Sequence, residues 1–459
     1  MGVRFKACDR EQLFLLPPSL RDWLPAGDLA YFVIDVVDQL ELSGIYRYYE
    51  VAEASEDRPE RRKAASGQPA FHPKMMVALL LYAYCNGTTS SRRIARLCER
   101  DAGYRVVSAD QQPNFRTISE FRRIHLEALR ALFVQVLHLA REAGLVKLGH
   151  VALDGTKVKA NASKHKAMSY ARMQEREAEY VREIEALLAE AEQIDTAEDG
   201  VHGPDRRGDE LPTELQFRQT RLERIREAKA ALEAAAQEKA RTEGKLDDEG
   251  NPKPPRRGRP PAVPPGTPKP KDQRNFTDPD SRIMKMNHKG FDQAYNCQAA
   301  VDSQSQIIVA QAVTNAANDK EQVEPLVEQV KANLGEKPKR ASADSGYYSE
   351  ANVRYVRAEE IDDYVCPDRL KHGETQPAVR GRIPKNLSFI DRVRRKLLTK
   401  KGRQIYGLRK QIVEPVFGQM KQGRGLRQFL LRGLEKVAGE WSLWCTSHNL
   451  LKVWAAASG

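Results

Sequence analysis

The chain has 459 residues, 41% of them hydrophobic, and a formal net charge of +12. This length predicts several domains, and the positive charge favours an anionic partner, most often nucleic acid, with a solvated basic surface as the alternative. No apolar run reaches the roughly 18 residues that a membrane helix needs. The N-terminus lacks a signal-peptide pattern, and the six cysteines form no CxxC pair. These features exclude a membrane protein and a disulfide framework, so we expect a cytoplasmic location.

Residues 1–147 are predicted to form a helical N-terminal domain. The expected helices span 28–40, 72–87, 90–101 and 117–144. Thr117 and Glu120 give the last helix a capping-box start, and Gly144 gives it a stop. Several arginines lie on the shorter helices, namely Arg92, Arg93, Arg96, Arg116, Arg122 and Arg123. This pattern predicts a DNA-binding module, with an ordinary bundle that has an arginine-rich face as the alternative.

The stretch 148–163 reads as a strand that contains Asp154 and Gly155. An Asp-Gly pair flanked by strand-like residues is typical of a two-residue hairpin. The same pair also fits a continuous strand that presents one carboxylate. We favour the continuous strand, because the polar end of this stretch is a poor antiparallel partner for its apolar beginning.

The segment 165–275 differs in character from the residues around it. Two charged helices, over 167–193 and 210–244, predict a helical hairpin that projects from the body because its apolar positions are sparse. A proline-rich stretch follows over 251–271, and it predicts an extended linker. Within it, Arg257 and Arg259 resemble an AT-hook, whose arginines enter the minor groove of DNA, although we favour a plain basic linker.

The remaining pattern predicts a mixed α/β sheet with this segment inserted after its first strand. Further strands are expected over 282–302, 306–315, 338–344 and 362–368, with a helix over 319–335 and another after residue 346. Asp154 and Asp344 each stand where functional side chains gather in open α/β sheets, at the end of a strand. Glu414 is a third candidate, in a strongly basic helical stretch, and an ordinary ion pair is the alternative for it.

Three stretches carry a resemblance to a known family: "VALDGTKVKANAS", "ASADSGYYSEAN" and "RKQIVEPVFGQMK". Together, and in this order, they resemble the DDE transposases of bacterial insertion sequences. The resemblance implies an RNase H-like catalytic fold over 148–164 and 276–436. The helical N-terminal part and an amphipathic C-terminal helix over 437–459 also fit that family. Trp441, Trp444 and Trp454 lie on this helix, and we expect them to pack in the core.

The resemblance further implies that Asp154, Asp344 and Glu414 are the catalytic acids. Related enzymes carry a Tyr-x2-Arg-x3-Glu-x6-Lys pattern. Tyr406, Glu414 and Lys421 fit it, but the basic position falls on Arg409 by one spacing and on Lys410 by the other. Pro415 cannot donate a helical hydrogen bond, so we expect a kink or a new helix there.

The chemistry that the family implies needs divalent cations, because three carboxylates would otherwise repel one another. Two Mg²⁺ ions, with Mn²⁺ as a substitute, would activate water and then a 3′-hydroxyl for cleavage of transposon-end DNA and strand transfer into target DNA. Lys421 and Arg424 are the expected phosphate contacts. Family analogy also implies a homodimer that pairs two terminal inverted repeats, in a protein associated with the nucleoid. An inactive or domesticated DNA-binding protein and an RNase H-like nuclease without strand transfer are the alternatives.

Overall fold

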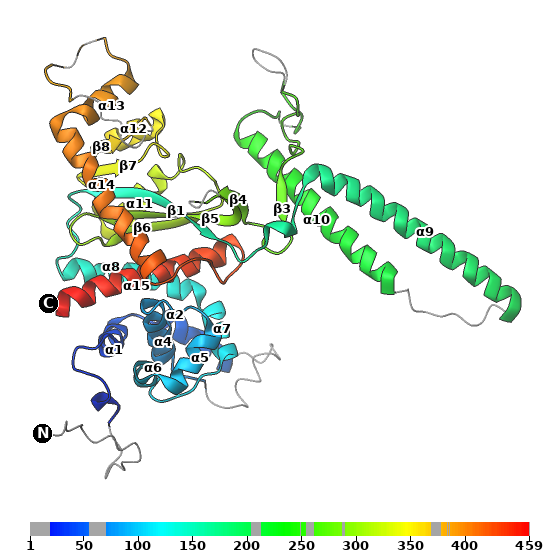
Figure 1. The fold of residues 1–459 in the computed structure, drawn as a ribbon, viewed down its shortest axis with the longest axis horizontal. Helices are drawn as coiled ribbons and strands as arrows, with labels where there is room; N and C mark the ends of the chain where they lie inside the picture. The colour runs from blue at the N-terminus through cyan, green and yellow to red at the C-terminus, as the bar shows by residue number, and fades with distance from the viewer. Residues whose placement is uncertain are drawn as a thin grey trace, which may run out of the picture.

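The computed structural model describes residues 19–54, 70–202, 213–247, 249–253, 261–286, 290–368, 378–382, 384 and 386–458. In Figure 1 a group of N-terminal helices lies below a twisted sheet, and a long pair of helices projects from one side of the body. None of the helices in these ranges is long and apolar enough to cross a lipid bilayer.

The N-terminal part is helical, as predicted. Its helices are α1 (Leu29–Gln39), α2 (Ser43–Ala54), α4 (Pro73–Cys85), α5 (Ser91–Arg100), α6 (Ala102–Val107), α7 (Phe115–Ile124) and α8 (Leu126–Glu142). The prediction of one helix over 117–144 was wrong, because the chain forms α7 and α8 with a break at His125. The N-cap of α7 is Asn114, whose side chain accepts hydrogen bonds from the backbone N–H groups of Arg116 and Thr117.

The central sheet combines antiparallel and parallel pairs. Its strands are β1 (Val151–Lys159), β4 (Arg282–Lys285), β5 (Phe291–Asp302), β6 (Ile308–Thr314), β7 (Arg340–Ala343) and β8 (Asp362–Val365). β5 runs antiparallel to β1, β4 and β6, whereas β1, β7 and β8 run parallel to one another. The strand predicted over 282–302 is therefore two strands, β4 and β5. The order along the sheet puts β1 between β5 and β7.

Two long helices cover the sheet. The helices after β6 are α11 (Val323–Leu334), α12 (Glu350–Ala358), α13 (Phe389–Leu398), α14 (Lys400–Gly418) and α15 (Leu434–Ser458). α14 crosses β1, β5, β7 and β8, and α15 lies between β6 and the N-terminal helices α4 and α8 (Figure 1). Trp441 and Trp444 of α15 are buried, which confirms the expected core packing. Trp454 is only partly buried against the same core.

A kink or a new helix was predicted at Pro415, and the new helix was wrong. α14 continues through Pro415 to Gly418, and a π-helical turn over Gln419–Gly423 follows. A proline removes one intrahelical hydrogen bond, but the packing of neighbouring residues Val413 and Val416 in the core keeps the helix intact.

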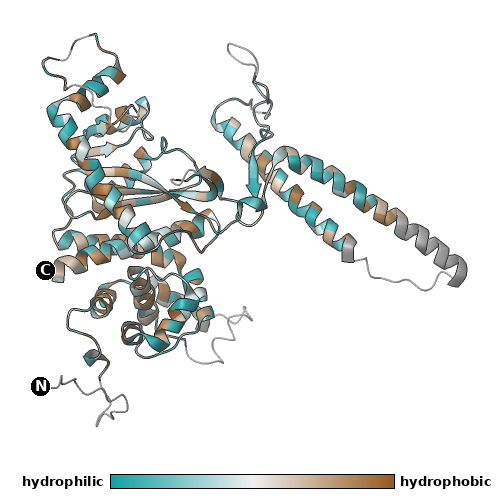
Figure 2. Ribbon diagram, in the orientation of Figure 1, coloured by the Kyte–Doolittle hydropathy of each residue, from teal (hydrophilic) through white to brown (hydrophobic). Residues whose placement is uncertain are grey.

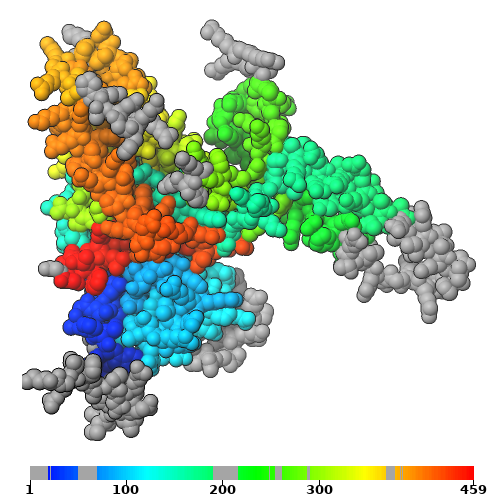
Figure 3. Space-filling model, in the orientation of Figure 1, coloured from blue at the N-terminus to red at the C-terminus, as the bar shows by residue number. Residues whose placement is uncertain are grey.

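The projecting arm consists of α9 (Tyr170–His202) and α10 (Thr213–Thr242), with the short strands β2 (Ala167–Ser169) and β3 (Gln273–Asn275) at its base. Figure 2 shows mostly hydrophilic residues along it, and Figure 3 shows that it stands away from the body. The two helices are joined by ion pairs, such as Glu183 with Arg218 at 2.7 Å. The AT-hook-like residues Arg257 and Arg259 lie outside the described residues.

Candidate active site

Asp154 and Asp344 lie side by side on neighbouring parallel strands. Leu153 of β1 is the register partner of Ala343, the last residue of β7, and the two aspartates are the residues that directly follow this pair in the chain. Paired strands lie about 4.8 Å apart, and register partners point to the same face of a sheet. β1 continues past Asp154 to Lys159 in unbroken pairing with β5. This confirms the predicted continuous strand and excludes a hairpin at the Asp-Gly pair.

Asp154 is held in a largely buried position against a cation from α14. Its carboxylate is 18% exposed, and its Oδ2 lies 3.1 Å from an Nη atom of Arg409. Its Oδ1 accepts a hydrogen bond from the N–H of Gly155 at 2.9 Å. Burial raises the pKa of Asp154 to about 6; Arg409 acts against this rise, and the negative charge of Asp344 adds to it. The positive charge of Arg409 therefore does not fully offset the effect of burial on the Asp154 carboxyl group.

Asp344 begins a tight turn between β7 and α12. Its Oδ1 accepts a hydrogen bond from the N–H of Gly346 at 2.8 Å, and its carbonyl accepts one from the N–H of Tyr347 at 3.2 Å. This arrangement fixes the carboxylate at the carboxyl end of β7, which is where an α/β sheet presents functional groups.

Glu414 lies on α14 in an exposed position. Glu414 comes five positions after Arg409, so the two side chains leave the helix in directions about 140° apart. The structure still links them electrostatically. Burial acts to lower the pKa of Arg409, but the charges of Asp154, Asp344 and Glu414 outweigh it and raise that pKa. The charge of Glu414 therefore acts on the same arginine that contacts Asp154.

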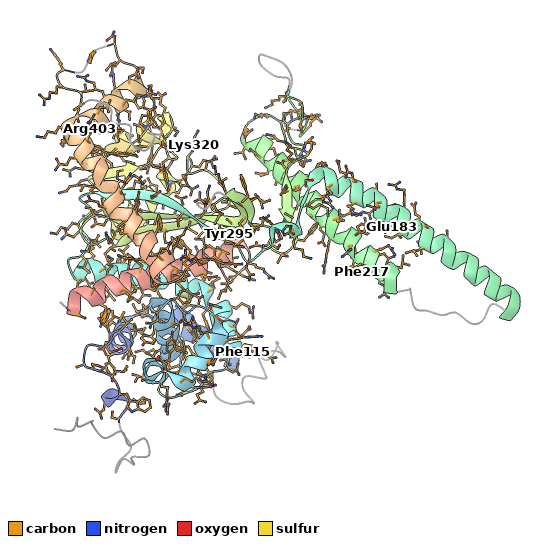
Figure 4. All side chains as sticks on the ribbon, viewed as in Figure 1. Phe115, Glu183, Phe217, Tyr295, Lys320 and Arg403 are labelled. Carbon is orange, nitrogen blue, oxygen red and sulfur yellow. The ribbon has the colours of Figure 1, made fainter. Side chains whose placement is uncertain are left out.

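A further acid, Asp319, was missed by the sequence analysis, which placed it in a helix. The helix starts only at Val323, and Asp319 lies in the loop that joins β6 to α11. Its Oδ1 accepts hydrogen bonds from the side-chain amides of Asn296 at 2.7 Å and Gln298 at 2.6 Å. Two buried amides on β5, Asn296 and Gln298, were the available signal, because buried polar groups need partners. Lys320, its neighbour in sequence, is labelled in Figure 4.

The basic residues predicted around Glu414 point in different directions. Arg409 faces Asp154, whereas Lys410 is exposed. Lys421 donates a hydrogen bond to the carbonyl of Lys157 on β1 at 2.8 Å. Arg424 lies over the ring of Trp444 and donates to Ser447 Oγ at 2.7 Å.

Tyr406 is partly buried, and its ring lies 5.9 Å from the Arg409 guanidinium carbon. The DNA contacts predicted for this group remain predictions. Their placement in the fold shows that Lys421 and Arg424 already have partners within the chain.

Of the six arginines predicted for a DNA-binding face in the N-terminal part, five are exposed, but Arg122 is buried and the prediction is wrong for it. Arg92 and Arg93 lie on the solvent side of α5, and the guanidinium of Arg92 lies 5.0 Å from the ring centre of Phe115. Phe115 is itself 37% exposed and is labelled in Figure 4. Arg122, on the same group of helices, is buried and donates to the carbonyl of Thr89 at 3.0 Å. The exposed arginines and the buried one therefore serve different purposes.

The donor set fits a hard divalent cation in its chemistry. Aspartate and glutamate oxygens are the ligands that Mg²⁺ prefers. The raised pKa of Asp154 shows a buried carboxyl that additional positive charge would stabilise in its ionised form. Within the described ranges, however, no three acidic, histidine or cysteine side chains lie close enough together to hold one ion. Among the described residues, the acids of the site therefore do not form a closed coordination sphere.

Comparison with protein families agrees with this geometry. Residues 265–450 match the family model of a transposase DDE domain, and residues 18–123 match that of a transposase domain, DUF772. Both matched ranges describe a transposase, and together they span more than half of the chain. No curated protein and no solved structure matches the chain.

The chain belongs to the DDE transposases of insertion sequences. This family depends on divalent metal ions and acts on DNA. Asp344 and Glu414 lie inside the matched DDE range, and Asp154 lies before it, on a strand that the sheet pairing joins to that range.

Proposed function

We propose that this transposase cuts transposon-end DNA and joins the freed end to target DNA, with Asp154, Asp344 and Glu414 as its catalytic acids. The pairing of β1 with β7 is the observation that carries the proposal, because it brings two of the three acids together from distant parts of the chain. The mixed sheet, with Asp154 within β1 and Asp344 directly after β7, also supports an RNase H-like catalytic domain over 148–164 and 276–436. The helices before residue 148 are proposed to bind DNA.

The three acids are proposed to hold divalent cations, Mg²⁺ or Mn²⁺ in its place. The bound ions would supply positive charge at the phosphodiester that is cut. Arg409 keeps Asp154 oriented through its contact at 3.1 Å and offsets part of the negative charge of the two aspartates. Lys421 ties the end of α14 to β1 at Lys157, which holds the helix that carries Glu414 against the strand that carries Asp154.

A basic groove at the far end of β1 is proposed to hold the DNA backbone. Its cavity measures about 520 Å³, and its basic lining residues are Lys159, Lys164, His165, Lys166 and Arg432. Asp292 also lines it and lies 3.6 Å from Lys159. Phosphate contacts of lysine make affinity fall with salt, so Lys164→Gln with Lys166→Gln should lower the slope of log affinity against log salt by about 2.

The decisive experiment uses the full chain and DNA that carries the inverted repeats flanking its gene. Asp154→Asn should reduce strand cleavage in Mg²⁺ by roughly 1,000-fold or more, because each 1.36 kcal/mol of lost transition-state stabilisation costs tenfold in rate. DNA binding should survive. Glu321→Gln, at an exposed acid outside the site, is the control. Full cleavage by Asp154→Asn would overturn the assignment.

Pre-cleaved ends distinguish the proposal from a nuclease without strand transfer. The transposase should join such ends to a plasmid, whereas a nuclease would only cut. A protein that binds ends but neither cuts nor joins them would be an inactive or domesticated relative. The size of the complex with end DNA should correspond to two copies of the chain, as expected of a homodimer that pairs two ends.

A further inference from the structure

Asp319 lies between the two glycines that follow the paired aspartates. Gly155 comes directly after Asp154, and Gly346 comes two residues after Asp344. A Cβ atom at Gly155 would lie 2.8 Å from Asp319 Oδ1, and one at Gly346 would lie 3.1 Å from Asp319 Oδ2. Both distances are shorter than ordinary carbon–oxygen contacts. The carboxylate of Asp319 therefore fills the space that the two glycines leave open, and it touches the backbone beside each catalytic acid.

A chain of hydrogen bonds runs from Asp319 to the turn that carries Asp344. Gln298 Nε2 donates to Asp319 Oδ1 at 2.6 Å, and the Tyr347 hydroxyl donates to Gln298 Oε1. Burial raises the pKa of Tyr347 well above its ordinary value, and the charge of Asp319 adds to the rise, so the hydroxyl keeps its proton. This fixes the direction of each bond and turns the amide nitrogen of Gln298 toward Asp319.

A second connection joins the loop of Asp319 to the same turn. The side-chain amide of Asn352, on α12, donates to the carbonyl of Lys320 at 2.6 Å and to the carbonyl of Tyr347 at 2.7 Å. Lys320 is the residue after Asp319, and Tyr347 is the third residue after Asp344. The loop after β6 and the turn after β7 are thus held together on two sides, through Gln298 of the sheet and through Asn352 of α12.

We propose that Asp319 is a positioning residue, which holds the turn bearing Asp344 at a fixed place beside β1 and so sets the separation of the two aspartates. This inference rests on the proposed function of Asp154 and Asp344 as metal-binding acids. Asp319 acts as a hydrogen-bond acceptor for Gln298 and Asn296, which are buried and have no contact with solvent to replace it. Residues that orient metal ligands from behind affect metal affinity strongly.

The test compares two substitutions in the full chain. Asp319→Ala removes the acceptor, and it should weaken binding of Mn²⁺ alone, measured by calorimetry without DNA, by about 10- to 100-fold. End cleavage should fall about 100-fold, since a misplaced catalytic group costs that much. Asp319→Asn keeps an oxygen that accepts both amides. It should retain Mn²⁺ binding and cleavage within about tenfold of wild type, because hydrogen bonds to a neutral acceptor are weaker.

Tyr347→Phe provides an independent variant at the other end of the chain of hydrogen bonds, should Asp319→Ala fold poorly. It removes the donor to Gln298 and leaves Asp319 in place, and Mn²⁺ binding should weaken in the same direction. Glu321→Ala is the matched control, because it removes an exposed acid two residues away and should change neither measurement.

Three results would overturn the inference. If the Asp319→Ala and Tyr347→Phe variants bind Mn²⁺ and cut DNA as wild type does, the Asp319 carboxylate has no positioning role. An Asp319→Asn variant as defective as Asp319→Ala would show that the negative charge itself is required. A wild-type protein that neither cuts nor binds Mn²⁺ would overturn the proposed function together with this inference, whereas the first two results leave the proposed function intact.

Discussion

The acids on β1 and β7 and the basic residues after α13 show two ways in which charged side chains are placed. Asp154 and Asp344 lie on paired strands, and the backbone register alone puts them side by side. Arg409 lies on α14, Lys421 on the π-helical turn that follows it and Arg424 directly after that turn, and their side chains reach a carboxylate, a backbone carbonyl and a serine hydroxyl respectively. A strand places alternate residues on one face, whereas a helix distributes residues around its axis. The strand-borne pair is therefore determined by topology, and the helix-borne cations by local packing.

The largest expected effect tests the strand-borne half of this comparison. Gly155→Ala would put a methyl group 2.7 Å from Gln298 Nε2 and 2.8 Å from Asp319 Oδ1. The strand or the loop must shift, so cleavage of end DNA should fall about 100-fold. Gly149→Ala is the matched control, because a Cβ there meets nothing within 4 Å. Equal activity of the two variants would mean that the close packing at Gly155 does not matter for catalysis.

The next prediction separates a buried cation from a DNA contact. Arg424→Ala should lower the free energy of unfolding by about 2 kcal/mol, because the guanidinium loses its hydrogen bond to Ser447 and its contact with Trp444. The slope of log DNA affinity against log salt should stay unchanged. Denaturant unfolding and binding titrations at several salt concentrations measure the two quantities. A flatter salt slope with normal stability would restore Arg424 as a phosphate contact.

A smaller effect distinguishes the two residues that compete for the basic position of the family pattern. Arg409→Gln removes the guanidinium that lies 3.1 Å from Asp154 and should slow cleavage about tenfold. Lys410→Gln changes an exposed side chain and should slow it by about twofold. Single-turnover cleavage of both variants gives the ranking. The reverse ranking would assign the family position to Lys410.

The smallest expected effect concerns Glu440 of α15, an ionisable side chain that is buried in the core. It is fully buried, it accepts hydrogen bonds from the N–H groups of Leu430 and Leu431, and burial raises its pKa from 4.5 to about 7. The folded state thus binds the proton more tightly than the unfolded chain. Its contribution to stability is complete below pH 4.5 and is lost as the pH rises through about 7.

Between pH 6 and 8 this loss amounts to about 1 kcal/mol. Glu440→Gln cannot release a proton, so its thermal midpoint should decline less over this range than that of wild type. Parallel declines in the two proteins would show that Glu440 stays protonated, or stays charged, throughout.

Much of the fold was predictable from local patterns. The end of α4, the two helices of the arm and the continuous strand through Asp154 followed from apolar spacing, caps and strand composition. The break between α7 and α8 was not predictable, because the apolar pattern of the sequence runs through His125 without interruption. The ring of His125 packs there against Phe121, with ring centres 4.6 Å apart. Similarly, the helix continues at Pro415 because core packing outweighs one lost hydrogen bond.

The candidate site was predictable only in part. Asp154, Asp344 and Glu414 stood out through their surroundings in the sequence and through the family resemblance. Asp319 did not, because its importance comes from amides on a strand about 20 residues earlier and from two distant glycines, Gly155 on β1 and Gly346 in the turn after β7. The contacts of Lys421 and Arg424 within the chain could not be predicted either. A count of basic residues does not distinguish a side chain that packs against the protein from one that faces solvent.

The position of α15 has a consequence for how recognition and cutting are related. One face of this helix packs against β6 and another against α4 and α8, so the helices proposed to bind DNA and the sheet proposed to cut it share a single wall. Neither part can swing without disturbing Trp441 and Trp444, which are buried inside that wall. The distance between the two parts is thereby fixed, so the number of base pairs between the bound DNA sequence and the cleaved bond should be constant.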